Sequence, residues 1–162
     1  MIDGLDANIT KILQENARTS NAEIARQVGL APSAVFERIR KLEERGVLRG
    51  FRAEVDPHAV GLALLAFVFV RSNERVGSVG TAEKLARIPE VLEVHHIAGE
   101  DCFLVKLRAA DTEALGRLLR ERVGAIPTVS STRTTIVLET IKESRALPLE
   151  DSGEQDIQVK RA

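Results

Sequence analysis

Four residues that begin or end helices divide the first third of the chain, and they restrict its fold more than any other feature. Ser20 opens Ser-Asn-Ala-Glu, a capping box whose hydroxyl and carboxylate can each accept from a free backbone N–H at a helix start. Gly29 can end that helix in the left-handed conformation, and Pro32 is favoured in the first turn of the next helix. Gly46 can end this next helix as Gly29 ends the previous one. The pattern predicts two helices that meet across a tight turn.

Apolar residues recur at helical spacing in the segments that these boundaries define. The spacing predicts a first amphipathic helix near residues 5–17, a second between Ser20 and Gly29, and a third over about 32–45. In the third helix, Val35 and Leu42 fall on one side, and most of the charged residues fall on the others. We therefore expect a small three-helix core with a polar outer face on the third helix.

Residues 47–55 alternate imperfectly between apolar and polar residues, which is typical of a short two-stranded wing or of an extended link. Two short helices, a glycine-bearing turn, a proline-started basic helix and a wing together are typical of a winged helix-turn-helix. In that motif the third helix lies in the major groove of DNA, where arginine is the favoured partner of guanine.

Positive charge is concentrated around the third helix. Residues 33–52 contain six Lys or Arg residues and three Glu residues, whereas the whole chain has a formal net charge of −1. One alternative is an ordinary solvated helix face, whose cations pair with Glu37 and Glu44 at a spacing of three or four residues. The combination of helices, turn and basic helix favours a DNA-reading element over this alternative.

The apolar run Leu62–Val70 begins a second region with a different pattern. It is short enough for one strand and apolar on both alternating faces. A helix layer covers one face, and we expect the same sheet of a second subunit to cover the other. The pattern then predicts a helix at 78–88, strands at 91–97 and 102–109, a helix at 111–123 and a strand at 129–141. The order βαββαβ is typical of a ferredoxin-like sandwich, so the predicted fold class is α+β.

The N-terminal residues resemble the DNA-binding domain of the Lrp/AsnC (feast/famine) regulators. Pro57 and Gly61 extend the resemblance beyond the helices, and it covers roughly residues 3–147. One departure is Ala31, where the family commonly has serine, so the third helix lacks an N-cap worth about 1 kcal/mol. The segments that carry the resemblance are residues 6–13, 17–25, 29–43, 46–48 and 56–61.

The resemblance implies a division of the chain and a set of contacts with double-stranded DNA. It implies a helix-turn-helix domain over 1–50, a linker or wing strand over 51–61, a ferredoxin-like effector-binding and oligomerisation domain over 62–145, and a tail over 146–162. It further implies a homodimer that assembles into a tetramer or octamer. The expected DNA contacts are Ser33, Ala34, Phe36, Glu37, Arg38, Arg40 and Lys41.

The resemblance also places an effector site at the turn between the two middle strands. The turn resembles the family's Gly-x-x-Asp turn, where effector amino acids bind at subunit contacts, but Cys102 stands at the usual aspartate position. Carboxylates of the turn could bind an ammonium group, and backbone N–H groups and threonine hydroxyls could bind a carboxylate. The alternative is a solvated hairpin turn without a ligand. The expected effector residues are Gly99, Glu100, Asp101, Cys102, Thr132 and Thr134.

Several other classes of protein are disfavoured. The apolar run is too short to cross a bilayer, and the first residues lack the segments of a secretion signal, so we expect a cytoplasmic protein without membrane contact. The single cysteine cannot form an internal disulfide. His95 and His96 point to opposite faces of a strand, so no metal site is expected.

The leading interpretation is a sequence-specific transcription regulator controlled by an amino acid or related metabolite, with no other cofactor. The second hypothesis is an effector-independent, DNA-wrapping architectural protein of the same fold. An enzyme that uses Cys102 is disfavoured, because no orienting third group or oxyanion feature accompanies the thiol, and no catalytic residue is expected.

Overall fold

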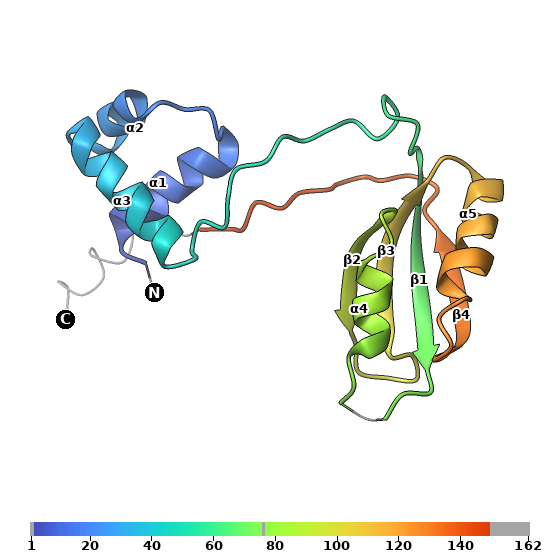
Figure 1. Ribbon diagram of the computed structural model, residues 1–162. Coiled ribbons are helices and arrows are strands. Elements are labelled where there is room, and N and C mark those ends of the chain that lie inside the picture. The colour runs from blue at the N-terminus through green and yellow to red at the C-terminus, as the bar shows by residue number, and fades with distance from the viewer. Residues whose placement is uncertain (1, 76, 150–162) are drawn as a thin grey trace, which may run out of the picture. The chain divides into compact units, whose positions relative to one another are not determined.

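The computed structural model describes residues 2–75 and 77–149, which divide into two compact units (Figure 1). The first unit holds the residues up to Ala53 together with those from Glu143 onward. The second unit holds Glu54–Lys142. The first is helical, and the second is built on a β-sheet.

Three helices form the first unit: α1 (Gly4–Glu15), α2 (Asn21–Val28) and α3 (Pro32–Glu44). The predicted boundaries are confirmed where local chemistry defines them. The Ser20 side chain accepts from the backbone N–H of Glu23, and Gly29 ends α2 with a φ of +72°. Pro32 opens α3, which has no side-chain N-cap at Ala31. Their core contains Ile9, Leu13, Ile24, Ala25 and Val35.

Two local details differ from expectation. The Glu23 carboxylate accepts hydrogen bonds from Arg26 and Gln27, so the serine half of the capping box forms without its reciprocal bond. Residues 47–55 contain no strand, so of the two predicted alternatives the extended link is the one observed. Gly50, with a φ of +134°, interrupts the extended backbone of this segment.

A four-stranded antiparallel sheet in the order β2-β3-β1-β4 forms the second unit. The predicted βαββαβ order is confirmed, although β1 begins two residues later and β4 ends five residues earlier than expected. The strands are β1 (Leu64–Ser72), β2 (Val91–His96), β3 (Phe103–Ala109) and β4 (Val129–Ile136), and the helices are α4 (Gly80–Ala86) and α5 (Thr112–Leu118), the latter continued by a π-helical turn (Leu119–Val123).

The two faces of the sheet have different surroundings. Val68 and Val70 of β1 are fully buried in one cluster with Leu85, from α4, and with Leu115, from α5. Both helices therefore cover the same face. On the opposite face the apolar ring of Phe69 is only partly buried within the chain.

The described segment after β4 contacts α1 of the first unit. After β4, the backbone of Leu147 makes two hydrogen bonds with the side chain of Gln14 of α1. Its N–H donates to Oε1 at 2.7 Å, and its carbonyl accepts from Nε2 at 3.0 Å. Of the predicted tail over 146–162, residues from 150 onward lie outside the described residues.

Candidate nucleic-acid interface and ligand site

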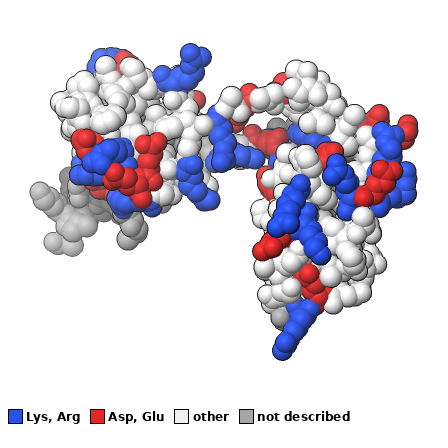
Figure 2. Space-filling model, in the orientation of Figure 1, with Lys and Arg blue, Asp and Glu red and all other residues white. Residues whose placement is uncertain are grey.

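The outer face of α3 is the candidate nucleic-acid interface. Val35 and Leu42 face the core and are fully buried, so the helix is fixed with its other side toward solvent. Ser33, Phe36 and Lys41 are exposed on that outer side. Acidic and basic groups are interleaved on the visible face of this unit, at the left of Figure 2. The surface is thus charged without being uniformly basic.

Arg40 is held by two carboxylates of its own helix. Its Nη2 lies 2.8 Å from Oε2 of Glu37, and its Nη1 contacts the carboxylate of Glu44. The hydrogen bond from Arg40 lowers the pKa of Glu37 below its ordinary value. Both pairs are about half exposed, so solvent screens them and each contributes little to stability. Either pair can therefore open at small cost when another anion approaches Arg40.

Arg38 occupies a different environment from the other predicted DNA contacts. Its Nη1 donates to Oδ2 of Asp3 at 2.8 Å and to Oδ1 of Asp6 at 2.7 Å. The Asp6 side chain is 10% exposed and that of Arg38 is 31% exposed. The hydrogen bond from Arg38 lowers the pKa of Asp3, with a further contribution from the backbone N–H of Asp6. This guanidinium joins α3 to the start of α1, whereas the sequence placed it among the groups that project outward.

The turn between β2 and β3 is the candidate ligand site, and two arginines hold it. Arg71 of β1 donates from Nε to the carbonyl of Glu100 at 3.1 Å, and its Nη2 lies 3.4 Å from the Glu100 carboxylate. Arg133 of β4 lies 3.0 Å from the Asp101 carboxylate and 3.9 Å above the ring of Phe69. Two acid–base pairs thus lie side by side at one end of the sheet.

The predicted threonines do not lie with this cluster. Thr132 and Thr134 pair with Val70 and Val68, whose side chains point to the helix-covered face. Arg133 pairs with Phe69 and points to the opposite face. Because neighbouring residues of a strand alternate, the turn and Arg133 share one face and the two threonines the other. The sequence does not show which residues of β4 face the helices, because β1 is apolar at both its odd and its even positions.

The cysteine and the two adjacent histidines each contact other groups of the chain. The thiol of Cys102 lies 3.4 Å from the backbone nitrogen of Ser72. The ring of His95 bonds Glu93, and the ring of His96 packs on Phe103. Within residues 2–75 and 77–149, no group of three or more His, Cys, Asp or Glu residues could hold a metal ion.

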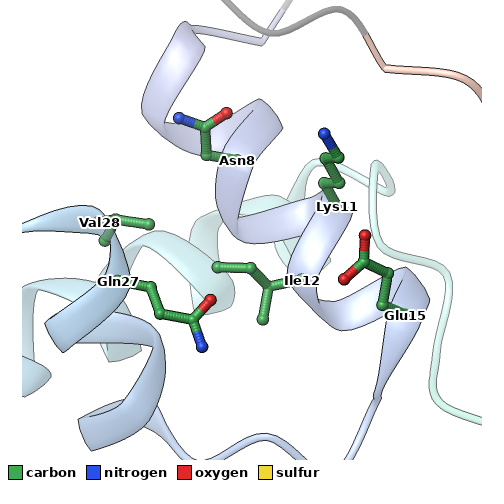
Figure 3. A pocket seen from close by; sticks show the side chains of 6 residues that line it. All are labelled: Asn8, Lys11, Ile12, Glu15, Gln27 and Val28. Atoms are coloured by element: carbon green, nitrogen blue, oxygen red, sulfur yellow. The ribbon is translucent and has the colours of Figure 1, made fainter.

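A shallow hollow of about 330 Å³ lies between α1 and α2 (Figure 3). In Figure 3, Ile12 lies in the middle of the hollow, and the polar side chains of Asn8, Lys11, Glu15 and Gln27 lie around it. The hollow is open, and none of the predicted site residues lines it, so it adds nothing to either candidate site. Its lining comprises Asn8, Lys11, Ile12, Glu15, Gln27 and Val28.

Comparison with known families gives two matches that together span most of the chain. Residues 2–43 match the AsnC-type helix-turn-helix domain, and residues 65–147 match the Lrp/AsnC ligand binding domain. Both regions were expected from the sequence. No helix among the described residues has the length and apolar character needed to span a membrane.

Individual proteins of known name are similar over nearly the whole chain. HTH-type transcriptional regulator FL11 of Pyrococcus horikoshii is 41% identical over 148 residues, which cover 91% of this chain and 97% of that protein. The leucine-responsive regulatory protein of Escherichia coli is 36% identical over 148 residues, which cover 90% of each chain. A solved transcriptional regulator–L-methionine complex from Neisseria meningitidis is 30% identical, with a TM-score of 0.86, and covers 92% of this chain and 97% of that one.

Proposed function

Because this chain belongs to the Lrp/AsnC family of transcription regulators, we propose that it binds specific duplex DNA through α3 and responds to an amino acid at the β2–β3 turn. The observation that carries the first part is α3 itself, fixed by its buried stripe with its opposite side exposed. We propose that Arg38 positions this helix and that the other six residues contact DNA: Ser33, Ala34, Phe36, Glu37, Arg40 and Lys41.

The salt dependence of DNA binding tests this assignment. Each phosphate contact that is lost lowers the slope of log affinity against log salt by about 0.9. Lys41→Ala should therefore lower both affinity and slope, whereas Arg38→Ala should lower affinity with the slope unchanged. Lys84→Ala, an exposed lysine of α4, is the matched control. A slope for the intact protein that is shallow and insensitive to Lys41→Ala and Arg40→Ala would contradict DNA binding through α3.

The acid–base pairs at the turn support an amino acid as the effector. A zwitterion carries one charge of each sign, and it can replace both partners of an existing pair without leaving an unpaired charge. We propose that its carboxylate binds Arg133 and its ammonium group binds Asp101, with Arg71 and Glu100 beside them. The names of the two relatives that mention leucine and L-methionine favour the same ligand class.

Thermal unfolding in the presence of each of the twenty amino acids tests the effector. A ligand at one hundred times its Kd stabilises the protein by about 2.7 kcal/mol, which is a shift of several degrees. Arg133→Gln should abolish the shift, and Arg87→Gln, at the end of α4, should retain it. No shift with any amino acid, together with intact DNA binding, would favour the effector-independent architectural protein.

The open face of the sheet supports a homodimer, which further contacts would extend to a tetramer or octamer. Phe67 and Phe69 lie on that face and are only partly buried within one chain. We propose that the same face of a second copy covers them. Phe67→Glu should lower the mass found by sedimentation equilibrium, and Val79→Glu, at the start of α4, should not. An unchanged mass in both variants would contradict this interface.

We further propose that the protein is not an enzyme and that it acts in the cytoplasm, where it would meet the DNA that it binds. The pairing of Cys102 with the main chain of Ser72 supports the first point, because the partners of the thiol within residues 2–75 and 77–149 are a backbone N–H and a backbone carbonyl, neither of which is a catalytic base. An activity that is lost in Cys102→Ser would contradict it.

A further inference from the structure

The first five residues of α3 carry no charged side chain. Pro32, Ser33, Ala34, Val35 and Phe36 form its first turn and a half, and every charge of the helix lies from position 37 onward. A recognition helix brings its N-terminal residues to the base edges. The part of α3 that enters the groove furthest therefore has no guanidinium with which to bind guanine.

Phe36 is the largest side chain in this uncharged segment, and it is 54% exposed. Val35 beside it is fully buried, so the orientation of the helix leaves the Phe36 ring on the outside. Ser33, one turn earlier, is exposed and small, which leaves room for a base pair to approach the ring. An exposed aromatic ring near the N-terminus of a helix that binds DNA is placed where it can contact an apolar group on a base edge.

The most prominent apolar group in the major groove is the C5 methyl of thymine. The hydrogen-bond donors and acceptors that identify the other bases there are groups that a phenyl ring cannot satisfy. We propose that Phe36 is a specificity-determining residue that contacts a thymine methyl in the operator. This inference rests on the proposed DNA binding through α3, and it adds the base that the helix selects.

Replacement of thymine by deoxyuridine tests the contact, because deoxyuridine lacks only this methyl. The probe is a duplex that the full chain itself selects from a random pool, with each thymine replaced in turn. Loss of one buried methyl should weaken binding by the wild type about fourfold at the contacted position. Phe36→Ala should bind thymine and deoxyuridine duplexes equally, and Phe36→Leu should retain part of the discrimination.

Phe51→Ala is the matched control, because Phe51 is also a largely exposed phenylalanine of the first unit but lies outside α3. It should discriminate as the wild type does. If the wild type binds the selected duplex and Phe36→Ala keeps the full discrimination, the inference is wrong while the proposed function stands. If Phe36→Ala instead changes only the sedimentation mass, the ring belongs to a protein contact, and the inference is again wrong. If the wild type selects no duplex, the proposed function itself fails.

Discussion

Removal of the Arg38 guanidinium should destabilise the helical unit far more than removal of the neighbouring Arg40. Arg38 donates to two carboxylates, and the side chain of one of them, Asp6, is 10% exposed. Without Arg38, the guanidinium of Arg45 still faces Asp6, with its Nη1 3.9 Å from the second carboxylate oxygen. Arg38→Ala therefore leaves a largely buried carboxylate without its short hydrogen bond and with a counter-charge at a longer distance.

The magnitude follows from the two environments of the guanidinium. A hydrogen bond between charged groups, one of them nearly buried, contributes about 1.5–3 kcal/mol. The bond to the exposed Asp3 contributes about 0.2–1 kcal/mol. We expect Arg38→Ala to cost about 2–3 kcal/mol, and Arg40→Ala, which breaks only exposed pairs, to cost much less. The three-helix segment of about fifty residues has about 3–7 kcal/mol in total, so Arg38→Ala removes a large share.

Amide hydrogen exchange measures this effect in the full chain, because it gives the free energy of opening for each helix separately. The amides of Ile9, Val35 and Leu42 lie in the core of the unit and report on it. A double-mutant cycle with Asp6→Asn should give a coupling energy of about 1.5 kcal/mol. Equal losses for Arg38→Ala and Arg40→Ala, or a coupling below about 0.5 kcal/mol, would refute the reasoning.

Three further predictions concern other parts of the molecule. The folded-state pKa of Asp3 is lowered, so its stabilising contribution is present above pH 3.8 and is lost as the pH falls through the folded-state value. Urea titrations should therefore show the difference in stability between the wild type and Arg38→Ala narrowing below pH 3.8 by the contribution of Asp3. Thr81→Val should cost about 1–3 kcal/mol in thermal unfolding, because it leaves the hydroxyls of Ser72 and Thr128 without their buried partner. Gln14→Ala should increase proteolysis near Leu147, whereas an unchanged cleavage rate would show that the two hydrogen bonds do not hold the segment.

The parts of the fold that local chemistry determines were predictable from the sequence. The cap at Ser20, the left-handed end at Gly29 and the start at Pro32 depend on one residue each, and all three are observed. The order of strands and helices followed from periodicity. Residues 47–55 were ambiguous, because a wing needs a second strand to pair with, and pairing is not a local property.

The candidate sites were less predictable, since they depend on contacts between distant segments. The partners of Arg38 lie 35 and 32 residues away along the chain, and nothing in the helix itself distinguishes it from Arg40. The apolar strand β1 gave no indication of which of its alternating residues face the helices. Thr132 and Thr134 were therefore predicted as effector residues, and Arg133 between them was not. In each case the missing information was the direction of a side chain, not the identity of a residue.

The pairing of charges within α3 has a consequence for how it discriminates between DNA sequences. A phosphate that binds Arg40 competes with Glu37 and Glu44, so nonspecific attraction is partly offset when an existing pair weakens. The uncharged first five residues of the helix carry no such cost, because Ser33 and Phe36 have no ionic partner to lose. Base contacts in that segment therefore contribute a larger share of the net binding energy than they would beside unpaired arginines. A helix of this composition gains specificity by weakening its general affinity for the phosphate backbone.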